Sequence, residues 1–574
     1  MKAFGWRWLA GLACAAAGAW AAWRLHGAPR LGVDDANIFF VYAEHLARGA
    51  GLVYNAGGER VEGVTSLLWT LLCAAAFALA RRPEALLLAL SVLLTATAQA
   101  ALLMILRRGR RDAGRGAAPD LFEWAYLILV FASPAYVTWT TIALMDTALW
   151  GALLAVALAL ARPAATRGRQ AAAGAVLCLL LPARPESLLA APALLALLLA
   201  RTAAEAGPRA AWRAGWRLGL ALALTAAALT VFRLAYFGYP LPNTYYAKVS
   251  PSLAYNLREG LRYFRRFMEE SRIAAAGLAV ALLAVGTRAY AQTAAALRAG
   301  RWRRLWAFAP SDLEATAWLA LLLLALPVLT GGDHFAMARF YQPAYPLLCL
   351  LLTQAARACA PPPAPAAAAA GAERVGWRRA GAAAAALLAL GPLAWWAKAF
   401  GNEPNWAALA AGSPIQHEFR IAENGLALGR AAQTLFADRA PLPALGAIAA
   451  GGVKRGYAGP VVDLMGLNDT RFGHGPGDRT GMKNHAAFEK ATFFRILPEM
   501  VWARPATPPA TVSRDDLILK GLLSDERFRS LYTYTEITAA TNGAPSLCLY
   551  FRNDFLAELL QSGRYRRTPE AGGP

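Results

Sequence analysis

The chain has 574 residues, of which 57% are hydrophobic and only 16% are charged, whereas an average soluble protein has about 25% charged residues. The net charge is +22, and residues 1–397 carry most of it, with 38 Lys and Arg against 19 Asp and Glu. Because these basic residues separate long apolar runs, the composition excludes a disordered chain and argues against nucleic acid as a partner. The sequence predicts a multi-pass membrane protein with membrane lipids as partners.

In chain order, many apolar runs approach the ~20 residues that a helix needs to cross a bilayer. The longer runs are residues 9–24, 85–106, 121–141, 218–236, 312–330, 341–358 and 378–397. Shorter runs of the same character are residues 143–161, 171–182, 187–200 and 272–286. Together they predict about 11 membrane spans.

The orientation follows from the basic loops, because Lys and Arg are enriched in short cytoplasmic loops. Residues 107–115, 162–169, 201–217, 288–304 and 374–379 are therefore expected in the cytoplasm. The loops alternate correctly only if a further apolar run, residues 64–80, does not cross the membrane. We expect it to form a re-entrant or interfacial helix in the first outer loop. The N-terminus is then cytoplasmic. The protein is expected in the inner membrane of a bacterium.

Residues 398–574 differ in kind, with 20 Lys and Arg against 17 Asp and Glu and strand-like runs such as Leu547–Phe551. A low-complexity segment at 361–371 is expected to be a cytoplasmic linker. The predicted fold is mainly α: a polytopic transmembrane module in residues 1–397, followed by a soluble α/β or α+β domain in residues 398–574. This domain is expected on the extracytoplasmic face.

The most distinctive polar feature is the pair Asp34-Asp35, which directly follows the first predicted span. Adjacent carboxylates near a membrane repel each other, which raises one pKa or recruits a cation, and either outcome suits a general base. Asp is equally favoured at the N-terminus of a helix, where it caps backbone N–H groups. On position alone, both interpretations remain open.

The segment around this pair runs DDANIFFVYAEHLARGAGLVYNAGGERVEGVTSLLW. It resembles the first outer loop of the GT-C superfamily of polyprenyl-phosphate-sugar-dependent membrane glycosyltransferases. The likeness is greatest to the terminal β-(1→2) arabinofuranosyltransferases of mycobacterial cell-wall arabinan synthesis and their bacterial relatives. Two positions depart from that pattern, since Leu67 replaces the usual Pro and Asn37 replaces a common aromatic residue.

Further blocks resemble the same family in the same order. They are Met145–Thr147, Arg184–Glu186, Tyr239–Lys248 (YPLPNTYYAK), Gly331–Arg339 (GGDHFAMAR) and Val462–Asp469 (VDLMGLND). The likeness covers the chain in patches, and the first loop and the PNTYYAK block are its most specific parts. The likeness also implies a membrane-lying helix in the first outer loop. The distribution of basic residues among the loops independently predicts the same helix.

The resemblance implies an inverting transfer of one sugar, possibly arabinofuranose, from a polyprenyl-phosphate donor to a glycan, glycolipid or protein acceptor. Asp35 is the predicted base, with Asp34 as its partner or as a positioning group. Lys248, Arg184 and Arg339 are candidates for the donor phosphate, and His334 is a candidate for phosphate or sugar. Asp146 and Glu186 are candidates for the sugar or for a divalent cation. The acceptor candidates are Asn243, Tyr245 and Tyr246. A divalent cation, Mg or Mn, is a possible cofactor, with Asp34, Asp35 and Asp146 as its candidate ligands.

Each of these residues also has a simpler interpretation. A basic side chain near the membrane boundary can snorkel to the interface, and Tyr is common at that depth. Pro-Asn is ordinary turn chemistry, a lone His at a helix end is often structural, and carboxylates at a span end can be solvated.

Two other functions stay open. A transporter or flippase of lipid-linked glycans would bury charged residues near mid-span and often shows repeated halves. A non-catalytic envelope assembly protein would not need Asp34 and Asp35. The long spans are nearly uncharged, the distinctive residues gather on one predicted face and no repeat is visible, so the sequence favours the transferase.

Overall fold

The computed structural model describes residues 2–108, 120–163, 166–299, 310–359, 415–477, 479–481, 486–506, 512–540 and 545–568. The chain forms two compact units. Unit 1 consists of Met1–Ala28, Leu87–Leu229 and Leu257–Ile415, and unit 2 consists of Pro29–Leu86, Thr230–Asn256 and Gln416–Pro574. The predicted span 378–397, linker 361–371, basic loop 374–379 and domain boundary at residue 397 lie outside the described residues and stay predictions.

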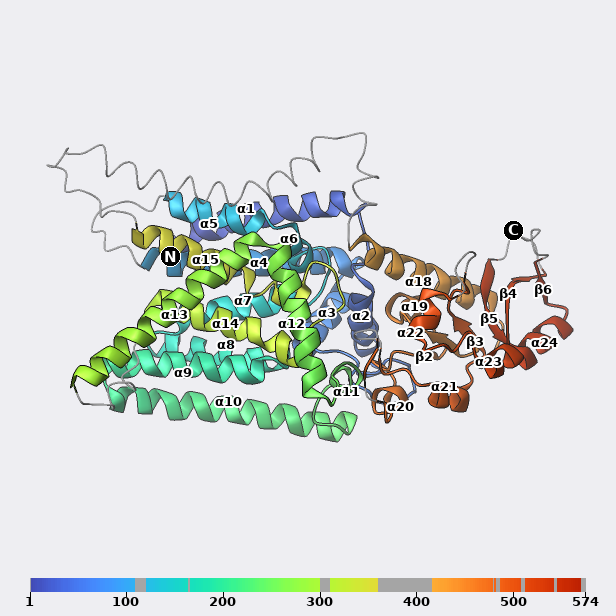
Figure 1. Ribbon diagram of the computed structural model, residues 1–574. Coiled ribbons are helices and arrows are strands. Elements are labelled where there is room, and N and C mark those ends of the chain that lie inside the picture. Colours follow the sequence, from blue (N-terminus) through green and yellow to red (C-terminus); the bar gives the residue numbers. More distant parts are fainter. Residues whose placement is uncertain are drawn as a thin grey trace. The chain divides into compact units, whose positions relative to one another are not determined.

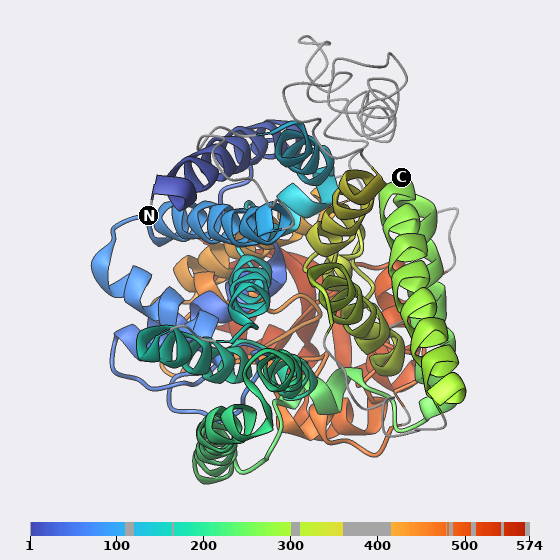
Figure 2. The same ribbon diagram turned by 90° about the vertical axis from the view of Figure 1, so that its left-hand side faces the viewer.

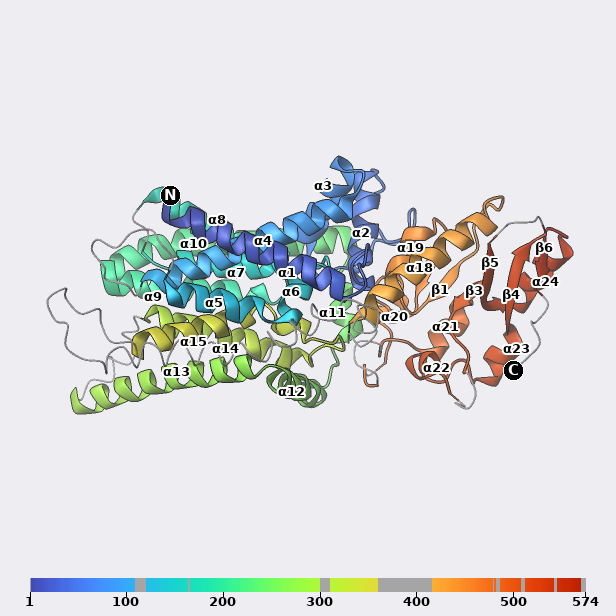
Figure 3. The ribbon, with the colours of Figure 1, turned by 90° about the horizontal axis from the view of Figure 1, so that it is seen from above.

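Unit 1 is a bundle of helices (Figure 1), which Figure 2 views more nearly end-on. Trp8 Nε1 of α1 donates a hydrogen bond to Thr97 Oγ1 of α4 at 3.3 Å, where the two helices cross (Figure 3). The helices that lie wholly or largely in this unit are α1 (Lys2–Leu25), α4 (Pro83–Arg108), α5 (Leu121–Phe131), α6 (Pro134–Thr140), α7 (Thr147–Leu160), α8 (Arg167–Ala183), α9 (Ser187–Ala206), α10 (Pro208–Phe237), α12 (Leu253–Glu270), α13 (Arg272–Ala299), α14 (Asp312–Thr330), η2 (Arg339–Tyr341) and α15 (Tyr345–Cys359).

Five described helices are long and apolar enough to cross a membrane, namely α4, α9, α10, α13 and α14. A bent pair, α5 with α6, would make a sixth span if it crosses as one unit. The mainly helical, multi-pass membrane fold is thereby confirmed. Helices α1, α7, α8 and α15 occupy other predicted spans but are shorter or less apolar, so the number 11 and the orientation stay predictions.

The predicted straight span 121–141 is broken in the structure. Helix α5 ends at Phe131, and α6 begins at Pro134 at an angle of 76°. Ser133 starts the new helix, because its side chain accepts the backbone N–H of Tyr136. Pro134 is favoured in the first turn of α6, where its missing N–H costs nothing. The Ser-Pro pair that causes this break lies inside the apolar run, so the hydropathy of the run did not indicate it.

Helix α3 (Leu67–Leu79) occupies the apolar run that was predicted not to cross. Its start is fixed by Ser66, whose hydroxyl accepts the backbone N–H of Trp69 at 3.2 Å. Thirteen helical residues extend roughly 20 Å, which is too short for a hydrocarbon core of ~30 Å. The length agrees with an interfacial helix.

Some of the loops that the sequence assigns to the same side contact each other in unit 1. Arg184 and Asp146, which lie in two different predicted outer loops, form an ion pair at 3.1 Å. The Arg184 guanidinium also lies over the ring of Phe340, which belongs to a third predicted outer loop. At the opposite end of α7, Arg162 pairs with Asp312 at 3.2 Å. Loops assigned to one side by their composition therefore meet within this unit.

Unit 2 combines helices from the first outer loop with the C-terminal part of the chain. Helix α2 (Asp34–Ala47) packs against α3, α18 and α19. The other helices of this unit are α11 (Asn243–Lys248), α18 (Gln416–Leu435), α19 (Gly451–Gly456), α20 (Thr470–Gly473), α21 (Lys490–Ile496), α22 (Arg514–Ile518), α23 (Glu526–Leu531) and α24 (Asn553–Gln561).

A six-stranded sheet forms the centre of the C-terminal part. Its order is β2-β1-β3-β5-β4-β6, where β2-β1-β3 are parallel and the remaining neighbours are antiparallel. The run Leu547–Phe551 lies in β5, as predicted, and its alternate residues are buried. The strands are β1 (Leu445–Ala447), β2 (Val461–Asp463), β3 (Met500–Trp502), β4 (Tyr532–Ala539), β5 (Ser546–Arg552) and β6 (Tyr565–Arg567).

Glycines let α18 and α19 approach closely enough for their backbones to touch. A Cβ added to Gly429 would lie 2.3 Å from the Val453 carbonyl oxygen, and one added to Gly452 would lie 2.3 Å from that of Ala422. Such distances are far below van der Waals contact, so only glycine fits. This packing fixes α19, on which the contact of Asp34 described below depends.

We expect Gly429→Ala to destabilise unit 2 by about 1–3 kcal/mol, because the added methyl group overpacks a rigid backbone contact. Thermal unfolding of the purified protein in detergent measures this change. Gly286→Ala is the matched control, since no atom lies within 4 Å of its Cβ position and Ala is the better helix former. Equal melting temperatures for Gly429→Ala and the wild type would contradict the close helix contact.

Candidate active site

Asp34 and Asp35 occupy the first turn of α2, but Asp34 does not cap its own helix. The N-cap position belongs to Val33. The backbone N–H groups of Gly451 and Gly452 instead donate to the two carboxylate oxygens of Asp34 at 3.0 and 2.8 Å. Asp34 thus caps the start of α19, and its side chain is almost fully buried.

Glycine is required at this contact. A Cβ on Gly451 would lie 2.1 Å from the backbone oxygen of Asp34. Burial raises the pKa of Asp34 to about 6, although the two glycine N–H groups act in the opposite direction. Both oxygens of Asp34 are therefore engaged in holding two distant parts of the chain together.

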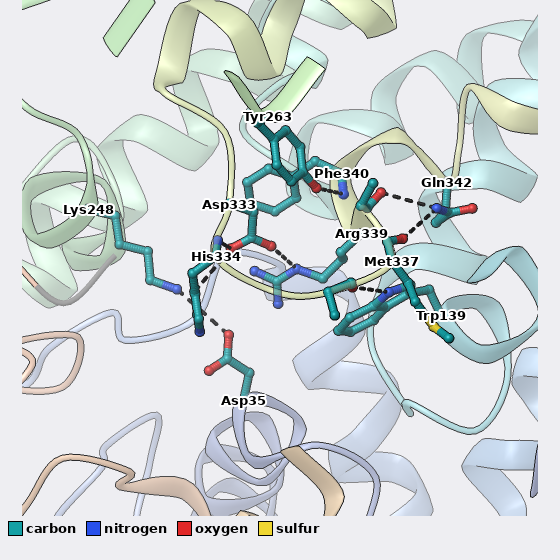
Figure 4. Close-up of polar contacts among 12 residues, drawn as sticks. Asp35, Trp139, Lys248, Tyr263, Asp333, His334, Met337, Arg339, Phe340 and Gln342 are labelled. Atoms are coloured by element: carbon teal, nitrogen blue, oxygen red, sulfur yellow. Dashed lines mark hydrogen bonds and ion pairs between the residues drawn. The ribbon is translucent and has the colours of Figure 1, made fainter. Parts of the chain in front are cut away.

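Asp35 has different surroundings. Its Oδ2 lies 3.7 Å from Lys248 Nζ, and the two side chains are 21% and 17% exposed (Figure 4). Lys248 is the last residue of α11, which places an ammonium group beside this carboxylate. Of the two adjacent carboxylates, Asp35 is the one that a substrate can reach.

Helix α11 is held in place by two other blocks singled out in the sequence. The backbone N–H of Asn243 donates to the Glu62 carbonyl oxygen at 2.9 Å. The Asn243 amide donates to the carbonyl oxygens of Gly466 and Leu467 at 2.8 and 3.0 Å. The blocks GERVEG (58–63), PNTYYAK (242–248) and VDLMGLND (462–469) therefore meet in unit 2, and the hydrogen bonds of Asn243 join them.

Gly63 is the closest point of this junction. A Cβ there would lie 1.9 Å from Asn468 Oδ1. The Gly63 N–H donates to the Tyr42 hydroxyl at 3.0 Å, and that hydroxyl donates to the Val61 carbonyl at 2.7 Å. These contacts explain why the motif ends in glycine.

An aromatic group adjoins α11. The His474 ring stacks on Tyr239, with centroids 3.9 Å apart, and lies 4.2 Å from the ring of Tyr246. Tyr245 meets Tyr246 edge-on at 5.6 Å and is exposed. Burial, together with the charge of Arg479, lowers the pKa of His474. Tyr245 and Tyr246, predicted for the acceptor, thus belong to a partly exposed aromatic surface of unit 2.

Several residues of this region were missed by the sequence analysis. Arg233 forms a buried ion pair with Glu62 at 2.8 Å and thereby fixes the GERVEG loop. Arg233 could have been recognised from the sequence, because it lies inside the predicted span 218–236. A charged side chain within a span is energetically costly and usually has a functional or structural partner. Gly451 and Gly452 had no comparable signal, since glycine pairs are common in loops.

In unit 1, Arg184 is bound by two carboxylates. Its Nη1 donates to both oxygens of Asp146 at 3.1 Å, and its Nε and Nη2 donate to Glu186 at 3.1 and 2.8 Å. Burial raises the pKa of Glu186 but Arg184 more than compensates, so that the pKa lies below its usual value. The three predicted residues are brought together, and Arg184 already has carboxylate partners.

Arg339 and Asp333 form a second buried pair in unit 1, with Nε donating to Oδ2 at 2.8 Å (Figure 4). The Arg339 guanidinium lies over the rings of Phe335 and Phe340, at 4.4 and 4.9 Å. His334 Nδ1 is 3.4 Å from Asp333 Oδ1. The predicted roles of Arg339 and His334 in donor binding stay predictions.

Metal binding has no direct support in the described part of the chain. Among those residues, no group of three or more His, Cys, Asp or Glu side chains is placed to hold a metal ion. A divalent cation therefore stays a prediction.

The comparisons with known proteins do not assign a family. No protein-family model matches the chain, and no curated protein matches it. A crystal structure of ArnT from Cupriavidus metallidurans bound to undecaprenyl phosphate is similar to this chain at 14% sequence identity. The match covers 81% of this chain and 88% of that chain, with a TM-score of 0.41.

Asp463, at the end of β2, is a second buried carboxyl group in unit 2. The backbone N–H groups of Met465 and Asn468 donate to it, both at 2.9 Å. Burial raises its pKa to about 6, against the effect of these hydrogen bonds. Because the folded state then holds a proton more tightly than the unfolded state, ionisation of Asp463 costs stability as the pH rises through about 6.

We expect the melting temperature of Asp463→Asn to depend less on pH than that of the wild type. Between pH 7 and pH 5 the wild type should gain about 1 kcal/mol from protonation of Asp463, and a group that does not titrate cannot supply this gain. Melting curves of both proteins at the two pH values measure the difference. Identical pH dependence would show that Asp463 has an ordinary pKa.

Proposed function

We propose that this protein is an inverting glycosyltransferase of the GT-C type. It would move a single sugar from a polyprenyl-phosphate donor to a glycan, glycolipid or protein acceptor on the extracytoplasmic face of the inner membrane. The multi-pass helical fold and the family-like blocks that meet in unit 2 support this proposal. Arabinofuranose is the proposed sugar on the strength of the sequence resemblance.

One observation carries the proposal: the two adjacent carboxylates have separate tasks. Asp34 is buried and accepts two backbone hydrogen bonds. Asp35 is partly exposed beside the ammonium group of Lys248. A partly exposed carboxylate is accessible to a substrate and is suited to take a proton from it, and the neighbouring ammonium group keeps that carboxylate ionised.

In the proposed reaction, Asp35 takes the proton of the acceptor hydroxyl as the hydroxyl oxygen attacks the anomeric carbon. The bond from that carbon to the phosphate oxygen breaks on the opposite face, and the electron pair leaves with the polyprenyl phosphate. The configuration at the anomeric carbon is thereby inverted. Lys248 offsets negative charge beside the reacting groups. Donor binding by Arg184, Arg339, His334, Asp146 and Glu186 belongs to the same proposal.

We expect Asp35→Asn to abolish turnover without loss of stability. A missing general base typically lowers the rate 10²–10⁴-fold, while the partly exposed position of Asp35 lets the isosteric amide fit without loss of packing. Asp34→Asn should instead lower the melting temperature, because its amide NH2 would face a glycine N–H. The assay follows release of polyprenyl phosphate from a synthetic polyprenyl-phosphate arabinofuranose with a short arabinan acceptor, in lipid.

Three results would separate the parts of this proposal. An active, folded Asp35→Asn variant would disprove the role of Asp35 as the base. A folded wild type that is inactive with the arabinofuranose donor but active with a hexose donor would correct the sugar alone. A folded wild type that is inactive with every donor would disprove the transferase.

Lys248→Gln should lower the turnover number about 10²- to 10³-fold, as expected for loss of a group that stabilises developing charge. Lys248→Arg should retain more activity, because the positive charge remains. Lys490→Gln is the matched control, since Lys490 pairs with Asp525 at 3.0 Å elsewhere in unit 2. Full activity of Lys248→Gln in the same assay would exclude Lys248 from the chemistry.

A further inference from the structure

Three arginines of unit 1 gather around a single carboxylate. We call this group the arginine cluster: Arg108, Arg162, Arg201 and Asp312. Arg108 ends α4, Arg162 follows α7, Arg201 lies in the last turns of α9, and Asp312 begins α14. All four lie at the end of the bundle where the sequence predicts cytoplasmic loops, opposite to the end that carries Arg184.

The distances show that the cluster is connected. Arg162 Nη2 lies 3.2 Å from Asp312 Oδ2, and Arg201 Nη2 lies 3.0 Å from Asp312 Oδ1. Arg108 interacts electrostatically with Asp312, Arg162 and Arg201. Within the cluster, one carboxylate therefore stands against three guanidinium groups, and the exposed Glu205 adds a negative charge near Arg201.

Part of the guanidinium groups of Arg108 and Arg201 serves to terminate a helix. Arg108 Nη2 donates to the Ala159 carbonyl oxygen at 2.7 Å, and Arg201 Nη1 donates to that of Ala161 at 3.0 Å. Both acceptors lie at the C-terminal end of α7, where carbonyl groups lack helical partners. Arg201 Nε donates to the Pro310 carbonyl at 2.9 Å. Helix capping thus explains some of the donors.

The remaining donors are not explained. Among the described residues, Arg108 Nη1 and Arg162 Nε are buried and have no hydrogen-bond acceptor. Arg201 is only 3% exposed. A buried donor without an acceptor costs about 1–3 kcal/mol, and more when it is charged, so the two donors, together with the surplus of positive charge, indicate that a ligand belongs there.

The charge of the missing ligand follows from its surroundings. The two segments that flank the cluster in sequence, residues 109–119 and 300–309, contain six Arg and one Asp. Their composition adds positive charge rather than the missing negative charge. The side chain of Arg162 is 38% exposed, which leaves an approach from outside.

We propose that the arginine cluster binds a phosphate group of a phospholipid headgroup or of free phosphate. Guanidinium groups match phosphate oxygens in charge and geometry and bind them with short, charge-assisted hydrogen bonds. Basic pockets between membrane helices on the cytoplasmic side are a known place for anionic lipid headgroups. A phosphate here would join the ends of α4, α7, α9 and α14, and it is separate from the proposed transfer of sugar.

The experiment measures binding rather than turnover. The purified full chain in detergent is melted with increasing amounts of phosphatidylglycerol, of diacylglycerol, which lacks phosphate, or of inorganic phosphate. We expect phosphatidylglycerol to raise the melting temperature and diacylglycerol to have no effect. A shift with inorganic phosphate alone would identify free phosphate as the source.

Two variants test the cluster in opposite directions. Arg162→Gln should weaken binding about tenfold, the equivalent of about 1.4 kcal/mol for one charge-assisted contact, while Arg201 still pairs with Asp312. Asp312→Asn should strengthen binding several-fold, because it removes the carboxylate that competes with phosphate. Arg213→Gln, an exposed arginine of α10, is the matched control and should bind as the wild type does.

The opposite effects of the two variants distinguish a ligand site from a structural cluster. If the arginines only held helices together, both Arg162→Gln and Asp312→Asn would lower stability and neither would change the response to phosphate. No shift of the wild type with any phosphate compound, or an equal shift for Arg162→Gln and the wild type, would overturn the proposal.

Discussion

The arrangement of unit 2 depends on one interaction, in which the Asp34 carboxylate accepts the backbone N–H groups of Gly451 and Gly452. It joins the first outer loop to the C-terminal part of the chain. It requires a residue without Cβ at position 451, and the glycines of α18 and α19 let α19 stand where it does. In the proposed reaction it also separates the two carboxylates, because Asp34 is held by two backbone groups while its neighbour Asp35 lies beside Lys248.

Physical chemistry explains why the sequence could predict the fold of unit 1 but only part of this site. Apolar length and the distribution of Arg act over tens of residues, so they predicted the helical membrane fold and the non-crossing run that became α3. The break between α5 and α6 depends on Ser133 and Pro134 alone. A membrane span is recognised from the mean hydropathy of about 20 residues, and two residues change that mean very little. A helix break inside a long apolar run is therefore difficult to predict from hydropathy.

The division of labour between Asp34 and Asp35 was out of reach for a different reason. The partners of Asp34 are 417 and 418 residues away, and no pattern within one segment contains that contact. The sequence marked the right blocks, since GERVEG, PNTYYAK and VDLMGLND do meet. It did not predict that Asn243 binds two backbone carbonyls or that Glu62 is neutralised by Arg233. The acceptor role of Asn243 stays a prediction.

Charge compensation differs between the two ends of unit 1. At the end with the predicted outer loops, Arg184 is bound by Asp146 and Glu186, and Arg339 by Asp333, so each buried cation has at least one carboxylate. At the other end, Arg7 pairs with Glu123 and Arg357 with Asp120. In the arginine cluster, however, Arg162 and Arg201 share Asp312, and Arg108 forms no ion pair with a described carboxylate. Membrane insertion favours basic residues at cytoplasmic ends, which accounts for the surplus of arginines but not for their burial. An arginine that only oriented the chain would remain in water, but Arg201 is buried and shares Asp312 with Arg162. The surplus positive charge of the cluster is therefore best stabilised by a counter-anion.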